Sequence, residues 1–268
     1  MQDNADKILD LHQTSEGILR LLMNDPKNKN ALSDQMMTQL KEQLFRASTD
    51  NSIKVIIIAA VGNVFCSGHN LKKITDARSN EDDGKSYFLD LFNLCSSLMQ
   101  MIISCSKPVI AEINGIATAA GCQLVASCDL AIASDISKFA TPGVNIGLFC
   151  STPMVALSRN VSKKDSMKML LTGDMIDAAE AKRISLINDH VSSDKLNDSV
   201  MSIANKIANK PLSTIKIGKD AFYRQTEMSL SDAYEFTSKV MTDNALSNDA
   251  KEGIISFLEK RDPIWNED

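Results

Sequence analysis

The segment "VFCSGHNL", residues 64–71, places a glycine directly before a histidine, just past a predicted buried strand. Glycine has no Cβ and adopts positive φ easily, so Gly68 allows the chain to turn sharply here. After such a turn the backbone N–H of His69 can point into a cavity instead of pairing within a sheet. The segment therefore offers a free backbone donor where ligands of α/β proteins gather.

A second segment, "ATAAG" at 117–121, has the residue types of a helix start with room for a ligand. The first four N–H groups of a helix have no partner within the helix, and the small residues Ala119, Ala120 and Gly121 would not keep a ligand away from them. Two such donors on one oxygen would stabilise an enolate or a tetrahedral anion, at ~3 kcal/mol per donor. Spacing alone leaves open the alternative that Gly68 and Gly121 are ordinary turn and packing glycines.

The elements that must position these segments alternate between strand and helix. The patterns predict strands after Gly17, over 55–61 and over 108–113, and helices from Ser33, over about 86–105 and from Thr118. The runs "IKVIIIAAV" and "PVIAEI" are typical of strands buried on both faces, so the chain is predicted to be α/β with its sheet covered on both sides. Beyond residue 160 successive helices are predicted, with a soft boundary near 205.

Composition and charge exclude several classes of function. The 268 residues are 44% hydrophobic and 24% charged with a formal charge of -5, which predicts a soluble globular protein without a nucleic-acid surface, since phosphate binding needs clustered Lys and Arg. Residues 1–17 lack the basic start and apolar core of a signal peptide. No stretch approaches the about 20 uninterrupted apolar residues of a membrane span, so none is expected.

Six cysteines, at 66, 95, 105, 122, 128 and 150, include no CxxC pair and lie in segments with the pattern of a core. This favours reduced, buried thiols over disulfides or a zinc site. We therefore expect no metal site and a cytoplasmic location.

Three longer stretches, "FCSGHNLK", "KPVIAEINGIATAAGCQLVASCDLAIAS" and "FATPGVNIGL", together with "NDPKNKNAL" at 24–32, resemble the crotonase family, the enoyl-CoA hydratase/isomerase superfamily. The likeness covers about residues 15–265 in one register. It implies a spiral of ββα units over 1–205 that binds a coenzyme A thioester, and a helical C-terminal oligomerisation region over 206–268. It also implies a trimer or hexamer, an acyl-CoA ligand, and no cofactor beyond the coenzyme A of that ligand.

The resemblance also implies roles for single residues. The oxyanion hole of the family falls on the N–H groups of His69 and Ala120, the two donors reached above from the backbone. Its coenzyme A contacts fall on residues of three segments, the last of them from an adjacent subunit: Lys27 and Lys29; Cys66, Gly68, Asn70 and Leu71; Phe257 and Lys260.

The hydration chemistry of the family uses two glutamates, and this sequence has neither. The two positions hold Gln123 and Gly143, which cannot transfer a proton at neutral pH. Loss of a general acid or base typically costs ~10²- to 10⁴-fold, so we expect no efficient enoyl-CoA hydration. Ser151 lies where isomerase relatives often have an Asp, and its hydroxyl lacks that acidity.

Two other functions remain open from the sequence. "SGHNL" and "TPGVNIG" resemble the decarboxylase branch of the superfamily, whose reaction on a malonyl-type CoA needs an oxyanion hole and no protein base. The other function is an inactive homologue that only binds acyl-CoA. The His69 ring is predicted to stack on the coenzyme, donate to a substrate carboxylate or fill a pocket wall.

The remaining polar candidates are interpreted as structural. Glu112 is predicted to point away from the site, and Asp129 to cap the entry of the following strand. Cys150 is interpreted as an inert thiol, and His12 and His190 as ordinary exposed residues.

Overall fold

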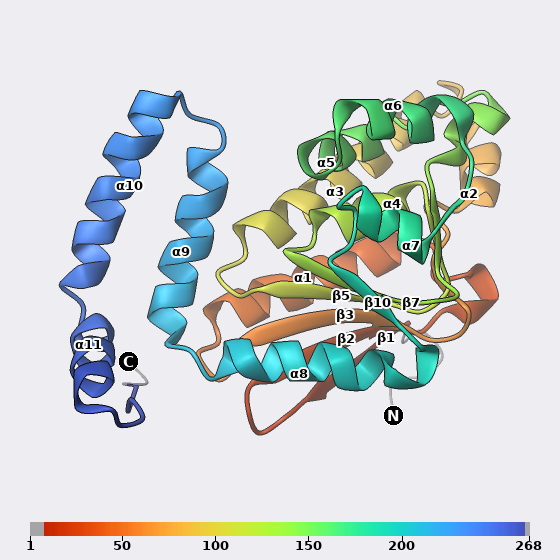
Figure 1. Ribbon diagram of the computed structural model, residues 1–268. Coiled ribbons are helices and arrows are strands. Elements are labelled where there is room, and N and C mark those ends of the chain that lie inside the picture. The colour runs from red at the N-terminus through yellow and green to blue at the C-terminus, as the bar shows by residue number, and fades with distance from the viewer. Residues whose placement is uncertain (1–7, 266–268) are drawn as a thin grey trace.

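The computed structural model describes residues 8–265 and contains two β-sheets surrounded by helices (Figure 1). The larger sheet has the strand order β1-β2-β3-β5-β7-β10, in which only the β1–β2 pair is antiparallel. Its strands are β1 (Leu9–Gln13), β2 (Ile18–Met23), β3 (Val55–Ala60), β5 (Val109–Ile113), β7 (Leu130–Ser134) and β10 (Asp189–Val191).

Helices cover both faces of this sheet, as the uninterrupted apolar runs predict. One core cluster lies between the sheet and α1 (Asp34–Thr49), α3 (Lys85–Ser104) and α4 (Ala120–Ser127). A smaller cluster lies on the opposite face, beneath α8 (Leu196–Ala208). Side chains alternate between the two faces of a sheet, so neighbouring residues of one strand belong to different clusters. In β3, Ile56 and Ile58 belong to the first cluster and Ile57 to the second.

The smaller sheet, β4-β6-β8-β9, carries the loops that sequence analysis singled out. Its strands are β4 (Val64–Cys66), β6 (Ile116–Thr118), β8 (Lys138–Ala140) and β9 (Ile176–Asp177). In this sheet, β4 pairs with β6 and β6 with β8, both in parallel. Their carboxyl ends therefore meet at one edge, where the segments beginning at Ser67, Ala119 and Thr141 emerge together.

The remaining helices complete the layers around this edge and connect the sheets. They are η2 (Pro26–Asn28), α2 (Leu71–Ala77), η3 (Pro142–Ile146), α5 (Pro153–Asn160), α6 (Lys163–Thr172), α7 (Ala178–Arg183) and η4 (Ser193–Lys195). α5 packs against α4 and α6 against η3, and Figure 1 shows α5 and α6 on the side of the molecule opposite α8.

The C-terminal helices stand to one side of the sheets (Figure 1). The helices α9 (Leu212–Gln225) and α10 (Leu230–Ala245) form a hairpin, and α11 (Asn248–Glu259) lies at the end of the hairpin opposite the α9–α10 turn. The predicted boundary near 205 would fall inside α8, which runs to Ala208 and packs on the large sheet. The role of 206–268 in oligomerisation stays a prediction.

The predicted α/β class with a helical C-terminal region is confirmed. Ser33 caps α1, its side chain accepting from the Met36 N–H at 3.2 Å. The predicted strand over 55–61 is β3, and the predicted helix over 86–105 is α3. Short strands such as β1, β7 and β8 had no sequence signal strong enough to be predicted.

One helix in residues 8–265 is long and apolar enough to cross a membrane by length and composition alone. It is α3, with 20 residues and a mean hydropathy of 1.2. Its buried residues, among them Leu91, Cys95 and Ile102, belong to the main core cluster, and it packs against α1 and α4. These contacts are those of a core helix, so α3 gives only weak support for a membrane span. The part of the signal-peptide prediction that concerns residues 1–7 lies outside the described residues.

Candidate functional site

A cavity of about 430 Å³ opens where the carboxyl ends of β4, β6 and β8 meet. Its wall is largely apolar, with hydroxyl, amide, thiol and imidazole groups between the apolar side chains. The residues that line it are Ser67, His69, Leu71, Ile74, Phe92, Ala119, Ala120, Pro142, Gly143, Asn145, Ile146, Leu148, Phe149, Cys150, Ser151, Thr152 and Pro153.

Two glycines bring the chain segments of this wall into direct contact. A Cβ on Gly121 would lie 2.2 Å from the carbonyl oxygen of Cys66, and one on Gly68 would lie 3.3 Å from the backbone nitrogen of Ala120. Gly68 also has a φ of +91°, which favours glycine. Any side chain at these positions would push apart the loop after β4 and the first turn of α4.

Each of the two segments contains a backbone N–H group without an acceptor in the described part of the chain. Within residues 8–265 the N–H groups of His69 and Ala120 have no hydrogen-bond acceptor, whereas the Ala119 N–H donates to the Ala140 carbonyl at 3.0 Å. The Thr118 hydroxyl donates to the Ser67 carbonyl at 3.1 Å and ties the segments together. Ala119 itself has a φ of +51°, an uncommon conformation for a residue other than glycine, directly before the helix start.

The His69 ring is held in one orientation. Its Nδ1 lies 3.0 Å from the carbonyl oxygen of Leu32, a fully buried residue. Burial lowers the pKa of His69, although the Leu32 carbonyl and the Asp34 charge act in the opposite direction. The ring also packs edge-on against Phe92, with centroids 5.7 Å apart.

Gln123 does not line the cavity, although the position was predicted to belong to the reaction centre. Its side chain is buried, and its Oε1 lies 3.8 Å from the Sγ of Cys95 on α3. The amide therefore faces the interface between α3 and α4.

Gly143 does line the cavity, and its surroundings exclude a side chain. A Cβ there would lie 2.7 Å from the Leu148 carbonyl oxygen and 2.9 Å from the Cys150 Sγ. The loop is closed by the Leu148 N–H, which donates to the Gly143 carbonyl at 2.9 Å. The space that a larger residue at 143 would need is occupied by the loop itself.

The neighbouring Cys150 and Ser151 also line the cavity. Burial raises the pKa of Cys150, so its thiol is protonated at neutral pH. The Ser151 hydroxyl lies on the exposed side and donates weakly to the Phe149 carbonyl at 3.4 Å. No carboxylate stands near either residue in the cavity wall.

The residues predicted to bind coenzyme A fall into three places. Leu71 lines the cavity, Cys66 and Gly68 support its wall from behind, and Asn70 caps α2 by accepting from the Lys72 and Lys73 N–H groups. Lys27 and Lys29 are exposed in and beside η2, and the Lys29 carbonyl accepts from the Ser67 N–H at 3.2 Å. Phe257 and Lys260 lie on or beside α11, across the molecule from α2 and α4 (Figure 1), so one chain alone does not bring them to the cavity.

The polar residues interpreted as structural have identifiable partners. Glu112 is buried and ion-paired with Arg20, on the α8 side of the large sheet and away from the cavity. Asp129 accepts from the Val109 N–H at 2.7 Å, so it caps the entry of β5 and not, as predicted, that of the following strand β7. His190 is partly exposed, with its Nδ1 2.9 Å from Asp135. All six cysteines are buried and free, and burial raises the pKa of Cys66 and Cys122 to about 12.

Residues that sequence analysis did not single out also shape the site. Asn30 is fully buried and donates to the carbonyls of Val61 and Val64, which fixes the turn before the site loop. Phe92 reaches the cavity from α3, where helical periodicity alone could not distinguish it from other apolar residues. The motif "NDPKNKNAL" was a usable signal for Asn30; none existed for Phe92.

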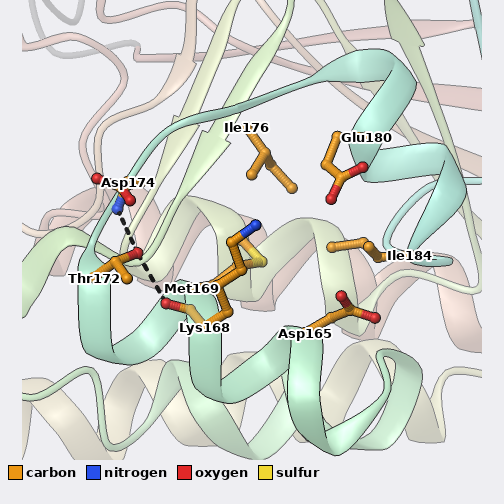
Figure 2. Close-up of a pocket in the computed structure, with 8 residues that line it drawn as sticks. All are labelled: Asp165, Lys168, Met169, Thr172, Asp174, Ile176, Glu180 and Ile184. Atoms are coloured by element: carbon orange, nitrogen blue, oxygen red, sulfur yellow. Dashed lines mark hydrogen bonds between the residues drawn. The ribbon is translucent and has the colours of Figure 1, made fainter.

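A second pocket, between α6 and α7, is too small for a metabolite (Figure 2). Its volume is about 20 Å³, about that of one water molecule. Figure 2 shows Asp165, Lys168 and Glu180 around it, and no group of acidic, His or Cys residues in the described part of the chain could hold a metal ion.

Comparison with known proteins identifies the family of this chain. The family model described as enoyl-CoA hydratase/isomerase matches residues 13–268. The chain belongs to the enoyl-CoA hydratase/isomerase family. This chain is 48% identical to enoyl-CoA hydratase domain-containing protein 3, mitochondrial, of Xenopus laevis, over 94% of this chain and 84% of that protein. It is 47% identical to the protein of the same name in Homo sapiens, over 94% of this chain and 81% of that protein.

Solved structures of this family share the fold. The crystal structure of human enoyl-CoA hydratase domain-containing protein 3 has a TM-score of 0.91 at 45% identity, covering 97% of this chain and 100% of that one. An enoyl-CoA hydratase from Mycobacterium smegmatis has a TM-score of 0.93 at 41% identity, covering 97% and 99%. The predicted crotonase-like fold is thereby confirmed.

The expected cytoplasmic location is wrong. The frog, mouse, rat, human and zebrafish relatives, 44–48% identical, are all named mitochondrial proteins. The expectation relied on reduced thiols, and these cannot separate one reducing compartment from another.

Proposed function

We propose that this protein binds an acyl-CoA thioester in the cavity and stabilises its enolate with the N–H groups of His69 and Ala120. The observation that carries this is the contact between the two segments: Gly68 and Gly121 allow it, and it leaves both donors without acceptors at the cavity wall. A low-dielectric cavity strengthens such donors because no water competes for the oxyanion.

Coenzyme A would extend from the cavity along Leu71 and the η2 turn, with Lys27 and Lys29 available for its phosphates. Phe257 and Lys260 would have to come from another subunit, because α11 of the same chain lies far away (Figure 1). The proposed assembly is a trimer or hexamer built through residues 206–268. By analogy with the relatives named above, the proposed compartment is the mitochondrion.

Efficient hydration of an enoyl-CoA does not fit this site. A hydratase must activate a water and deliver a proton to the α-carbon, and hydration in this family uses two carboxylates for these two tasks. Gln123 is turned into the α3–α4 interface, and Gly143 has no side chain. Among residues 8–265, no Asp or Glu lines the cavity.

A second candidate is decarboxylation of a malonyl-type CoA. The observation that favours it is the absence of any Lys or Arg among the lining residues. A carboxylate forced into this apolar wall would be poorly solvated, which favours loss of CO₂, and the remaining enolate would be held by the two donors.

Turnover distinguishes these functions. With crotonyl-CoA we expect less than about one thousandth of the hydratase rate typical of the family, because both proton-transfer groups are missing. The measurement is the loss of enoyl thioester absorbance, and robust hydration would contradict the proposal. Release of CO₂ from malonyl-, methylmalonyl- or ethylmalonyl-CoA would establish decarboxylation. Tight binding with no turnover of any of them would establish a binding protein.

Two variants test the donors themselves. Ala120→Pro removes the Ala120 N–H at the first helical position. Gly68→Ala places a Cβ 3.3 Å from the Ala120 nitrogen. Calorimetry with butyryl-CoA should show roughly 2- to 10-fold weaker binding for Ala120→Pro, the net effect of one hydrogen bond. Unchanged melting temperatures are the control for folding. Undiminished affinity in both variants would exclude this cavity as the thioester site.

A further inference from the structure

The cavity contains two titratable groups, and only one of them can take up a proton at neutral pH. No Asp, Glu, Lys, Arg or Tyr is among the lining residues, which leaves His69 and Cys150. Burial raises the pKa of Cys150, so its thiol already carries a proton. The imidazole of His69 is therefore the one side chain in the described cavity wall with a basic lone pair.

The partners of His69 fix the place of this lone pair. A carbonyl oxygen only accepts hydrogen bonds, so the 3.0 Å contact between Nδ1 and the Leu32 oxygen places the ring proton on Nδ1. In the neutral ring the lone pair is then on Nε2. Nε2 is buried and has no hydrogen-bond partner within residues 8–265. A buried acceptor without a partner is unfavourable, which makes it a place for a group that arrives with the ligand.

We propose that His69 is a catalytic base whose Nε2 removes a proton from the α-carbon of the bound acyl-CoA thioester. This inference rests on the proposed function, because the thioester oxygen must be held in the oxyanion hole. One residue would then act twice, with its backbone N–H on the thioester oxygen and its ring on the α-carbon, two bonds from that oxygen.

The step is a reversible proton transfer. The α C–H bond breaks and the Nε2–H bond forms, while the electron pair of the C–H bond forms the C1–C2 double bond and the carbonyl π pair moves to the oxygen. The products are a thioester enolate, held by the N–H groups of His69 and Ala120, and an imidazolium. Reversal returns a proton to the same carbon, and no other reactant is consumed.

Phe92 stands at the entrance to this atom. Its ring packs edge-on against the imidazole and is 37% exposed, while Nε2 itself is buried. Displacement of the Phe92 side chain by an acyl chain would open one path to Nε2. A rotation about its χ angles would suffice, because α3 carries the ring at the cavity edge and leaves it partly in solvent.

The test is exchange of α-protons with solvent. The wild-type protein is incubated in D₂O with butyryl-CoA and, separately, with the more acidic phenylacetyl-CoA, and loss of the α-proton signal is followed by NMR. His69→Asn keeps the backbone N–H, and its amide can still donate to the Leu32 carbonyl, but it has no basic nitrogen. The matched control is His190→Gln, a histidine that does not line the cavity and contacts Asp135 instead.

We expect exchange well above the enzyme-free rate in the wild type and in His190→Gln. His69→Asn should slow exchange at least ~100-fold, the usual effect of losing a general base, while its affinity for butyryl-CoA stays within a few-fold. Equal exchange in His69→Asn and wild type would overturn the inference, as would a wild type that binds butyryl-CoA without exchange. Both outcomes leave the proposed thioester binding intact, whereas absence of binding would overturn that as well.

Discussion

At the scale of single residues, the surroundings of Gly143 leave no room for a side chain. The Leu148 carbonyl and the Cys150 thiol occupy the volume into which any side chain at 143 would extend. Reintroducing a glutamate would require the loop 143–150 to open, and that loop is itself part of the cavity wall.

A test of this packing compares two Gly→Ala substitutions. Gly143→Ala should lower the free energy of unfolding by roughly 1–3 kcal/mol, as expected for overpacking. The control is Gly218→Ala, since a Cβ there meets nothing within 4 Å and Gly218 lies inside α9, where alanine is favoured by roughly 0.5–1 kcal/mol. Urea denaturation measures both. Gly143→Glu should fail to gain hydratase activity for the same reason. A Gly143→Ala variant as stable as wild type would contradict this, because it would show that the loop 143–150 can move to accommodate a side chain.

At the scale of elements, the C-terminal hairpin is attached to the core through one half-buried carboxylate. Asp129, between α4 and β7, accepts from Lys219 at 2.6 Å and from the Tyr223 hydroxyl at 2.8 Å, both on α9. The Lys219 ammonium also donates to the carbonyls of Ile102 and Lys107. All three donor positions of Lys219 are used, so α9 has one orientation against the end of α3.

Lys219→Met tests this attachment. The side chains of Lys219 and Asp129 are only 8% and 16% exposed, so removal of one partner leaves a poorly solvated carboxylate and should cost roughly 3–5 kcal/mol of unfolding free energy. Lys239→Met breaks an exposed pair with Glu235 on α10 and should leave stability unchanged. Chemical denaturation of both variants gives the comparison, and equal stabilities would show that α9 is held by its apolar contacts instead.

At the scale of the whole molecule, the C-terminal helices leave a large apolar surface exposed. α10 has no buried residue, and large apolar side chains of this region are exposed: Phe222, Leu230, Tyr234, Met241, Leu246, Ile254, Phe257 and Leu258. An apolar surface of this extent is typical of a protein interface. A second chain that covered it could also bring Phe257 and Lys260 to the coenzyme A site of its neighbour.

Light scattering on the full chain should therefore give three or six times the 29.3 kDa of one chain. Phe257→Asp, at a side chain 82% exposed, should shift the protein towards smaller species and weaken acyl-CoA binding together. Phe45→Asp on α1, 62% exposed, is the matched control and should change neither property. A monomeric wild type would remove the basis for a contribution from a neighbouring subunit.

Local patterns in the sequence determined much of this protein. The apolar run of β3, the Ser33 cap of α1 and the small residues at the start of α4 act through neighbours along the chain, so their structures and the free N–H of Ala120 could be predicted. The family resemblance predicted that Gln123 and Gly143 stand at the positions of two glutamates, and that assignment stays a prediction. The short strands β7, β8 and β10 could not be predicted because their stability comes from pairing with distant strands.

Only the tertiary structure decided which side chains share the cavity. It turned Gln123 into the α3–α4 interface, filled the space beside Gly143, and gave His69 a buried carbonyl partner from Leu32, 37 residues away. These outcomes depend on contacts between segments far apart in the chain, and residue type and spacing do not specify which face of an element a neighbour will cover. The sequence by itself determined the family and the donors, and the packing of distant segments decided which of the remaining groups can reach a substrate.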